Sequence, residues 1–376
     1  MHEADDTRCM RRCLELARQG AGRVSPNPMV GALLVADGEI IGEGYHHHFG
    51  SPHAEVEAIK SVTDQKKLFD ATLYVSLEPC SHLGKTPPCS QLIIEKAIPR
   101  VVIGCGDPNP DVSGKGVAQL RAAGVSVTEG VLEPECRRAN EAFIKSHTFG
   151  LPFVTIKLAQ TLDGKIATTL GASHWITGEE ARSEVHRMRS IHDAILIGEA
   201  TVTADDAHLT VRHCAGRNPL RVVLDRHLRL SPEAKIFDGA APTLLFVSSS
   251  WERLPKAEQF RQRGVTVLFV EEHAGELDLR QVLQELHQRH ILSVMVEGGS
   301  RLSASFIRAG LADKITMFIA PKLFGGDALS AFAPLGIDLP GQAVKLRFEP
   351  PRFYGIDMQV VAYIQAQTAS TCQAER

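Results

Sequence analysis

The sequence predicts an α/β fold arranged in two domains, and three observations lead to this prediction. Short apolar runs of strand length alternate with segments whose apolar residues recur at helical spacing, which is typical of a sheet covered by helices. The alternation pauses at Phe149–Pro152 and then begins again. A chain of 376 residues with 44% apolar residues is long enough to bury two cores. We therefore expect one domain at residues 1–148 and a second at residues 149–376.

The first half begins with a helix over residues 7–19, where apolar residues recur at helical spacing until Gly20 stops the pattern. Asp37-Gly38 is a hairpin signal between strands expected at residues 29–36 and 39–45. Pro88 then favours a helix start, because proline is tolerated at the first helical position. The other elements expected here are helices at 53–62, 116–123 and 134–147 and strands at 73–77, 101–104 and 125–128.

The second half repeats the alternation, and one junction in it has a particular chemistry. Gly298 and Gly299 lie between an expected strand and an expected helix, so backbone N–H groups could approach a phosphate there. The expected strands are 153–159, 194–198, 220–224, 243–247, 265–270, 291–296, 314–319 and 358–364. The expected helices are 179–191, 256–263, 279–289 and 302–309.

Composition excludes several classes of protein. A formal net charge of −3 gives no basic surface for nonspecific nucleic-acid binding. The acidic start Met1–Asp6 is unlike a signal peptide, and no apolar run approaches the roughly 20 residues that span a bilayer. Eight cysteines in so long a chain do not make a disulfide framework. We expect a cytoplasmic protein with no nucleic-acid or membrane partner and with thiols available to a metal.

Two stretches together predict a catalytic zinc site. His53, Cys80 and Cys89 offer one nitrogen and two sulfurs, and a catalytic zinc has three such ligands with a fourth position left for water. Glu55 lies two residues beyond the histidine, where it would transfer protons between the water and a leaving amine. The pattern H-x-E followed by P-C is the signature of zinc nucleobase deaminases, although eight residues separate these cysteines instead of two.

Three other interpretations of these stretches compete with the catalytic zinc site. A closed structural zinc site would need a fourth ligand such as His82, and Glu55 would then have no role. The run Gly84-Lys85-Thr86 resembles the end of a phosphate-binding loop, but Pro79 stands where that motif needs glycine. The run His46–His48 cannot direct all three rings to one ion from an extended segment, so its rings are expected in solvent or partly towards substrate.

The insertion Pro79–Cys89, together with His53–Glu55 and Ser25–Gly31, resembles the deaminase half of the bifunctional riboflavin-biosynthesis deaminase/reductase family. The resemblance implies a cytidine-deaminase-like, three-layer α/β/α domain that holds a pyrimidine bearing a phosphoribosyl group. By the same resemblance, the residues that contact this substrate are Asn27, His46, His82, Lys85 and Thr86.

The segments Lys157–Gly164, Ser173–Thr177, Ile197–Arg212 and Glu297–Gly299 resemble the reductase half of the same family. This implies a dihydrofolate-reductase-like α/β domain that uses NADPH, although no G-x-G-x-x-G fingerprint is present. The implied cofactor contacts are Ala159, Trp175, Thr201, Asp205, Gly299, Ser300, Arg301, Leu302, Ser303, Ala304 and Ser305. The implied substrate contacts are Ser173, Arg189, Leu209, Arg212 and Glu297.

The sequence therefore predicts an enzyme for two consecutive steps of riboflavin synthesis, with zinc in its first domain and NADPH in its second. A homo-oligomer is also implied by the family. The first alternative is a nucleic-acid or nucleoside deaminase with an accessory domain, which a basic groove would support. The second is a non-catalytic zinc scaffold, in which Glu55 would be dispensable.

Overall fold

The computed structural model describes residues 3–81, 87–109 and 112–365. The chain divides into two compact units, Met1–Leu151 and Pro152–Arg376. Each unit has a sheet of its own, as the alternating sequence pattern predicts. The predicted α/β fold class is confirmed.

Unit 1 contains a five-stranded sheet in the order β2-β1-β3-β4-β5. β1 pairs antiparallel with both β2 and β3, and the pairs β3–β4 and β4–β5 are parallel. β1 and β3 are buried along their whole length. The strands are β1 (Gly31–Ala36), β2 (Glu39–Tyr45), β3 (Thr72–Leu77), β4 (Arg100–Cys105) and β5 (Ser126–Glu129).

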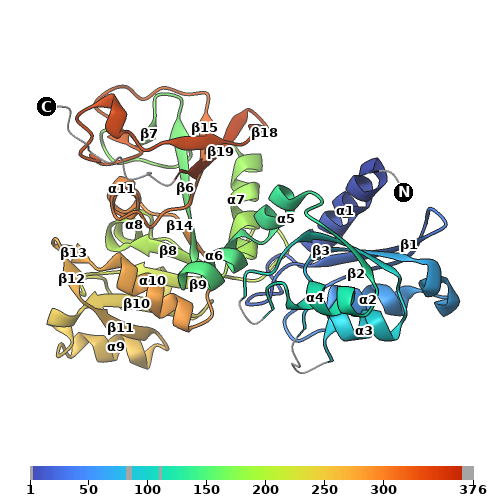
Figure 1. Ribbon diagram of the computed structural model, residues 1–376. Helices are drawn as coiled ribbons and strands as arrows, with labels where there is room; N and C mark the ends of the chain where they lie inside the picture. The colour runs from blue at the N-terminus through green and yellow to red at the C-terminus, as the bar shows by residue number, and fades with distance from the viewer. Residues whose placement is uncertain (1–2, 82–86, 110–111, 366–376) are drawn as a thin grey trace, which may run out of the picture. The chain divides into compact units, whose positions relative to one another are not determined.

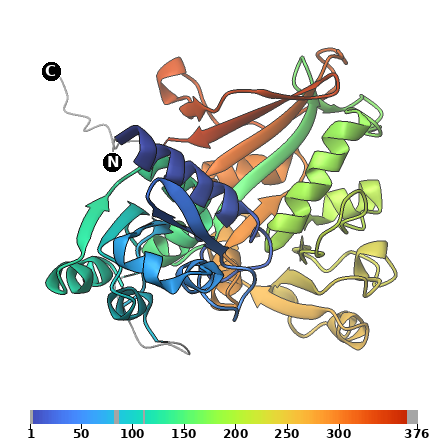
Figure 2. The ribbon, with the colours of Figure 1, turned by 90° about the vertical axis from the view of Figure 1, so that its right-hand side faces the viewer.

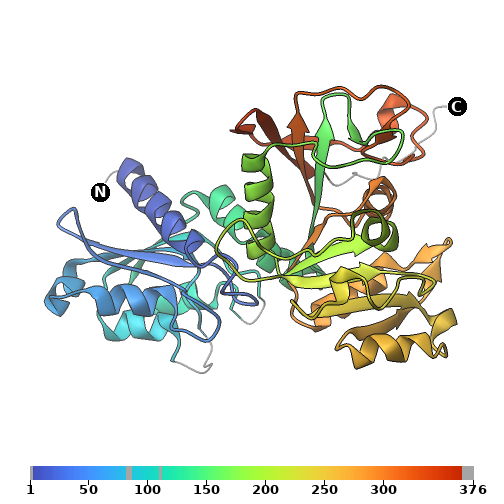
Figure 3. The same cartoon turned by 180° about the vertical axis from the view of Figure 1, so that it is seen from behind.

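Helices cover both faces of this sheet, which gives three α/β/α layers. α2, α3 and α4 lie on one face, and α1 lies on the opposite face (Figures 1 and 3). Ala58, Ile93 and Leu120 pack from the first face against sheet residues such as Leu34 and Val75. The helices are α1 (Glu3–Arg18), α2 (Ala54–Ser61), α3 (Cys89–Glu95), α4 (Lys115–Ala122), α5 (Glu133–Ala139) and α6 (Glu141–Phe149), with a 3₁₀ turn at Gln65–Asp70.

Unit 2 contains a larger sheet whose main order is β11-β10-β9-β8-β14-β6-β15-β19-β17. The strands from β11 to β15 run parallel, and β19 pairs antiparallel with β15, β17 and β18. Figure 2 shows β6 in green beside β15 and β19 in orange and red. These strands are β6 (Phe153–Thr161), β8 (Ala194–Gly198), β9 (Leu220–Leu224), β10 (Thr243–Ser248), β11 (Thr266–Val270), β14 (Ser293–Val296), β15 (Lys314–Ala320), β17 (Leu346–Phe348), β18 (Arg352–Tyr354) and β19 (Asp357–Ile364).

The remaining elements of unit 2 pack around this sheet. Phe237, Phe260 and Met295 belong to a core cluster of this unit and are almost fully buried. The helices are α7 (Glu179–Ile191), α8 (Glu199–Asp205), α9 (Lys256–Gln262), α10 (Leu279–Gln288) and α11 (Ser300–Arg308). Two short pairings, β7 (Lys165–Ala167) with β16 (Leu329–Ser330) and β12 (Glu272–His273) with β13 (Glu276–Leu277), lie outside the main sheet.

Most expected elements are present within one or two residues, and one expectation was wrong. The single helix predicted at residues 134–147 is two helices, α5 and α6, which meet at Asn140. Among the residues that the structure describes, none of the helices is long and apolar enough to cross a membrane.

Candidate active sites

Three elements of unit 1 bring one imidazole and two thiols together. His53 is the residue that caps the start of α2, Cys80 follows the end of β3, and Cys89 is the first residue of α3. Their ligand atoms all lie within 4.8 Å of one another. His53 Nδ1 lies 3.6 Å from Cys80 Sγ and 3.3 Å from Cys89 Sγ. The three donors therefore converge on one point, as their spacing in the sequence predicts.

The donor set fits zinc. In a tetrahedral site, Zn–S bonds of about 2.3 Å and Zn–N bonds of about 2.0 Å place sulfur and nitrogen roughly 3.5 Å apart, close to both separations seen here. Two sulfurs and one nitrogen are ligands that zinc prefers, and three protein ligands leave one position open. His82, the fourth ligand of the alternative closed site, lies outside the described residues.

Burial and mutual hydrogen bonding shift the protonation of these groups. Cys80 Sγ accepts hydrogen bonds from the thiol and backbone N–H of Cys89 and from His53, and these bonds lower the pKa of Cys80. The pKa of Cys89 is raised, because its thiol donates to Cys80 and is buried. The hydrogen bond to Cys80 raises the pKa of His53 to about 9. Burial raises the pKa of Glu55 to about 7. These directions hold for the donor set alone; a bound cation favours the thiolates and the neutral imidazole.

Two glycines allow α2 to approach the sheet closely enough to place His53 and Glu55. A Cβ at Gly44 would lie 2.3 Å from Ala58 N, and one at Gly42 would lie 2.5 Å from Ala58 O. Neither contact is possible for a residue with a side chain unless the helix moves. Glu55, in the first turn of α2, is 3% exposed.

Glu78 holds the segment that leads to Cys80. Its two carboxylate oxygens accept hydrogen bonds at 3.0–3.3 Å from four backbone N–H groups, those of Asp107, Gly114, Gly116 and Val117. Gly116 must lack a side chain, because a Cβ there would lie 2.1 Å from Pro79 O. Glu78 therefore ties the end of β3 to the start of α4.

Asn27 and His46 form a hydrogen-bonded pair close to the metal donors. His46 Nδ1 lies 3.0 Å from Pro52 O, and a carbonyl can only accept, so Nδ1 carries the proton. Nε2 of the neutral ring then accepts from Asn27 Nδ2 at 3.1 Å. Burial lowers the pKa of His46, which is 2% exposed, and so favours this neutral form. The pair leaves Asn27 Oδ1 as an acceptor, while His46 and His53 pack edge to face at 5.8 Å.

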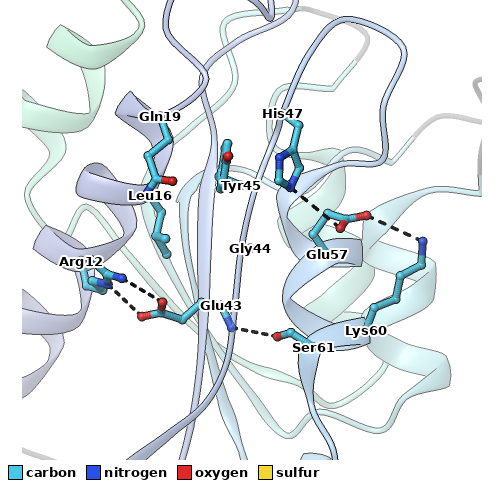
Figure 4. A pocket seen from close by; sticks show the side chains of 10 residues that line it. All are labelled: Arg12, Leu16, Gln19, Glu43, Gly44, Tyr45, His47, Glu57, Lys60 and Ser61. Atoms are coloured by element: carbon cyan, nitrogen blue, oxygen red, sulfur yellow. Dashed lines mark hydrogen bonds and ion pairs between the residues drawn. The ribbon is translucent and has the colours of Figure 1, made fainter.

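The other predicted substrate contacts of this domain, His82, Lys85 and Thr86, lie outside the described residues. A hollow of about 550 Å³ lies elsewhere in unit 1, between α1, β2 and α2 (Figure 4). Its charged side chains are paired, Arg12 with Glu43 and Glu57 with Lys60 and His47, and it contains none of the three metal donors. The hollow is therefore separate from the metal site.

In unit 2, most of the predicted cofactor contacts lie near the carboxyl ends of the neighbouring parallel strands β6, β14 and β8. α11 begins directly after Gly299, and within the described part of the chain no side chain caps its first N–H groups. A Cβ at Gly299 would lie 3.9 Å from Thr201 Oγ1, so the starts of α8 and α11 are adjacent. Uncapped amides beside a glycine pair suit a diphosphate, and a dinucleotide therefore fits this edge of the sheet. Along α11, Ser300, Ser303, Ala304 and Ser305 are buried, and Arg301 is exposed.

Trp175 and Asp205 flank this edge. Trp175 is 65% exposed, and the guanidinium of Arg182 stacks 4.5 Å from its ring. Asp205 Oδ1 accepts from Ser173 Oγ at 3.2 Å, which joins the segment before Trp175 to the end of α8. Ala159 is half-buried in β6.

A buried charged cluster underlies the predicted substrate contacts of unit 2. Arg189 donates to both carboxylate oxygens of Glu297, at 2.6 and 2.9 Å, and Lys157 lies 3.4 Å from the same group. Burial alone would raise the pKa of Glu297, but Arg189 and Lys157 outweigh it and lower that pKa to about 2. The guanidinium of Arg189 is therefore engaged by Glu297 rather than pointing at an unpaired anion.

Arg212 and Leu209 lie on the segment after α8. Leu209 is buried, whereas Arg212 is exposed and fixed through its backbone N–H, which donates to His186 Nδ1 at 3.1 Å. His186 packs edge to face on His213 at 4.5 Å. Arg212 thus presents its side chain to solvent from an anchored backbone.

Three residues that shape these sites were not among the predicted ones. Glu78 stands directly before Pro79-Cys80, and that position was its only sequence signal. Asn140 donates to Met29 O and accepts from Met29 N, at 2.9 and 2.8 Å, and so fixes the turn that carries Asn27. Lys157, noted only as part of a resembling segment, lies at the centre of the buried cluster.

Two known families match the two parts of the chain. Residues 3–105 match the family described as the cytidine and deoxycytidylate deaminase zinc-binding region. Residues 152–360 match the family described as the RibD C-terminal domain. The first match covers all three metal donors and Glu55, and the second covers every predicted cofactor contact.

Relatives match nearly the whole chain. The riboflavin biosynthesis protein RibD of Actinobacillus pleuropneumoniae is 43% identical over 350 residues, which is 93% of both chains. The RibD protein of Escherichia coli is 38% identical over 93% of this chain and 96% of its own. Among solved structures, the diaminohydroxyphosphoribosylaminopyrimidine deaminase/5-amino-6-(5-phosphoribosylamino)uracil reductase of Thermotoga maritima superposes with a TM-score of 0.85 at 41% identity, over 97% of this chain and all of its own. Acinetobacter baumannii RibD superposes with a TM-score of 0.86 at 35% identity, over 97% of this chain and all of its own.

Proposed function

The chain belongs to the RibD family of bifunctional riboflavin-biosynthesis enzymes, and from that premise we propose which of its residues perform each reaction. It is a deaminase and a reductase, with a cytidine-deaminase-like first domain and a dihydrofolate-reductase-like second domain. The two alternatives, a nucleic-acid or nucleoside deaminase and a non-catalytic zinc scaffold, are not kept. The relatives that match over more than nine-tenths of the chain are RibD proteins.

The first reaction is the hydrolytic deamination of 2,5-diamino-6-(5-phosphoribosylamino)pyrimidin-4(3H)-one. His53, Cys80 and Cys89 hold zinc, which when bound supplies Lewis-acid activation of water. Glu55 takes a proton from the attacking water and delivers it to the exocyclic amine, which leaves as ammonia. The convergence of the three donors beside the buried Glu55 is the observation that supports this assignment most strongly.

Asn27 orients the pyrimidine. The hydrogen bond from its Nδ2 to His46 leaves Oδ1 to accept from a ring or exocyclic N–H of the base. His46 thus acts on the substrate by fixing the Asn27 amide. Lys85 and Thr86 supply donors to the phosphoribosyl group, as the family resemblance implies.

The second reaction reduces the ribosyl group of the 5-amino-6-(5-phosphoribosylamino)uracil product to ribityl, with NADPH as hydride donor. Ala159 and Trp175 lie at the nicotinamide end of the cofactor, and the start of α11 holds its diphosphate beside Thr201 and Asp205. Arg212 binds the substrate phosphate, because its guanidinium can donate two parallel hydrogen bonds to it. Lys157, Glu297 and Ser173 face the sugar.

One assay tests both reactions. The purified protein is given the diaminopyrimidine with NADPH, and ammonia release and loss of NADPH absorbance are followed together. We expect one equivalent of each. Ammonia without NADPH oxidation would contradict the reductase assignment, and no ammonia at all would contradict the deaminase assignment.

The role of Glu55 has a sharper test. Glu55→Ala should lower ammonia release by at least about 100-fold, because general acid–base groups contribute on that order, while zinc content stays at wild-type level. Glu57→Ala is the matched control, since Glu57 lies on the same helix and, among the residues that the structure describes, forms ion pairs with His47 and Lys60. Equal ammonia release from Glu55→Ala and wild type would exclude Glu55 as the proton carrier.

A further inference from the structure

Trp175 lies in the irregular segment between β7 and α7, and a lysine from a different part of unit 2 holds this segment. Lys322 Nζ donates to Trp175 O at 3.0 Å and to Ile176 O at 2.7 Å. Hydrogen bonds from a charged donor are stronger than those between neutral groups. One ammonium group therefore fixes two consecutive carbonyl groups, at and directly after the residue assigned to the nicotinamide end of the cofactor.

The backbone of Lys322 is itself tied to the end of β6. Lys322 O accepts from Leu162 N at 2.9 Å, which continues the pairing of β15 with β6 beyond the ends of both strands. The Asp163 carboxylate accepts from Phe324 N and Gly325 N, at 3.2 and 2.8 Å. The lysine thus extends from an anchored position, and its ammonium joins the end of β6 to the Trp175 segment.

The indole ring of Trp175 is held separately from its backbone. The guanidinium of Arg182 lies 4.5 Å from the centre of the ring, and the same side chain donates to Thr177 O at 2.7 Å. The ring is still 65% exposed. An exposed ring that its neighbours already hold in place loses little conformational freedom when a ligand packs against it, and such preorganisation strengthens binding.

We propose that Lys322 is a positioning residue of the reductase, which fixes the backbone of Trp175 so that the indole is in place before NADPH binds. The inference rests on the proposed assignment of Trp175 to the nicotinamide end and goes beyond it, since Lys322 acts through Trp175 and not by contact with the cofactor. Without the ammonium group, the segment would be free to move, and NADPH binding would have to order it.

Titration calorimetry with NADPH, in the absence of the pyrimidine substrate, tests this. Lys322→Met keeps the apolar part of the side chain and removes the charged donor. We expect it to bind NADPH at least about fivefold more weakly, because two hydrogen bonds from a charged donor are lost at a partly exposed site. Lys322→Arg keeps a charged donor and should restore most of the affinity.

The position of the indole is followed directly by fluorescence. The chain has two tryptophans, so Trp175 is the one that remains in a Trp251→Phe background. Quenching of its emission by acrylamide, in the protein without NADPH, should increase in Lys322→Met and return towards the starting value in Lys322→Arg. Unchanged quenching in Lys322→Met would contradict the positioning role.

A double-mutant cycle decides whether Lys322 acts through the indole. In a Trp175→Ala background, Lys322→Met should weaken NADPH binding by less than about twofold, because no ring remains to be positioned. An equal loss in both backgrounds, or unchanged affinity in Lys322→Met alone, would overturn the inference and leave the cofactor placement intact. Unchanged NADPH affinity in Trp175→Ala itself would overturn the proposed cofactor placement together with the inference.

Lys165→Met is the matched control. The ammonium of Lys165 donates to Gly326 O and Ser330 Oγ, at 3.4 and 3.1 Å, so it also contacts the segment after β15 but lies on partners outside residues 173–178. Its substitution should keep NADPH affinity and the quenching of Trp175 within about twofold of their original values. An effect as large as that of Lys322→Met would show that general loosening of this segment weakens binding, and would overturn the inference.

Discussion

At the scale of single residues, Arg189 shows that a residue type alone does not specify the partner of its side chain. The family resemblance implies that Arg189 contacts substrate, and the structure shows that its guanidinium is paired with Glu297, 108 positions along the chain. The spacing of Arg189 and Glu297 in the sequence does not predict that they pair. Arg212 also has a side chain suited to phosphate, and it is exposed, which is why the phosphate is assigned to it.

Glu199 makes the stability of unit 2 depend on pH. Its pKa is raised to about 7 in the folded chain, so it keeps a proton that the unfolded chain loses near its ordinary value of 4.5. The folded state therefore loses stability as pH rises from about 4.5 to about 7. Glu199→Gln keeps the size of the side chain and cannot ionise.

We expect Glu199→Gln to match wild type in melting temperature at pH 5 and to exceed it by a few degrees at pH 8, since each kcal/mol shifts the midpoint by about 2–4 °C in a domain of this size. Calorimetric scans at both pH values measure this. Glu258→Gln, at an exposed helix position, should differ from wild type in melting temperature by the same amount at pH 5 and at pH 8. A constant difference for Glu199→Gln as well would mean that the pKa of Glu199 is not raised in the folded protein.

Glu78 is expected to be a main source of stability in unit 1. Glu78→Ala removes the acceptor of four backbone N–H groups. A buried donor left without its partner costs about 1–3 kcal/mol, so the free energy of unfolding should fall by about 3 kcal/mol or more. Urea denaturation measures it, with the exposed Glu129→Ala as a control expected to change it by less than about 0.5 kcal/mol. A small effect at Glu78 would indicate that water replaces the carboxylate.

At the scale of elements, the sequence predicted those with clear periodicity and missed those without it. The helix expected at residues 179–191 and the strand expected at residues 194–198 match α7 and β8. α8 was missed because its seven residues include Thr201, Val202 and Thr203, which are β-branched and have low helix propensity. β17 and β18 are only three residues each, too short for an alternating pattern to be recognised.

The metal donors were predictable because each is marked by its own local pattern. His53, Cys80 and Cys89 stand at the ends of a strand and two helices, and such junctions meet at one edge of an α/β sheet. Asn140 was not predictable, since it breaks a segment that otherwise has the pattern of one helix. Its contact with Met29 is a tertiary pairing that no local pattern contains.

Because α2 lies very close to β2, adding a single methyl group to Gly44 of β2 should displace the helix. Gly44→Ala would place a Cβ 2.3 Å from Ala58 N and 2.4 Å from Ala54 O, both backbone atoms of α2. The helix must shift, and overpacking of this kind costs about 1–3 kcal/mol. Because His53 directly precedes the first residue of α2, we expect zinc content and ammonia release to fall together.

Metal analysis of purified Gly44→Ala, alongside its thermal melt, measures this effect. Gly106→Ala is the control, because a Cβ there would make only an ordinary contact within the described part of the chain, with Glu78 Oε2 at 3.8 Å. It should leave zinc content unchanged. Full zinc occupancy in Gly44→Ala would show that the position of α2 does not determine that of His53.

At the scale of the whole molecule, each unit has its own sheet and its own core cluster, and each reaction is assigned to one unit. All three metal donors belong to unit 1, and all proposed cofactor contacts belong to unit 2. The family membership accounts for the pairing of two activities in one chain. Assembly into a homo-oligomer and a cytoplasmic location stay predictions.

This division predicts that loss of the metal from unit 1 abolishes deamination but leaves the reduction in unit 2 intact. Cys89→Ser should lose zinc and ammonia release, because a hydroxyl replaces a thiolate ligand and zinc prefers the sulfur. When 5-amino-6-(5-phosphoribosylamino)uracil is supplied directly, NADPH oxidation by the same variant should stay within about twofold of wild type, since unit 2 keeps its own core. Cys214→Ser, in unit 2 and outside the donor set, should retain both zinc and ammonia release. Loss of NADPH oxidation together with zinc would show instead that the folding of unit 2 depends on the metal site of unit 1.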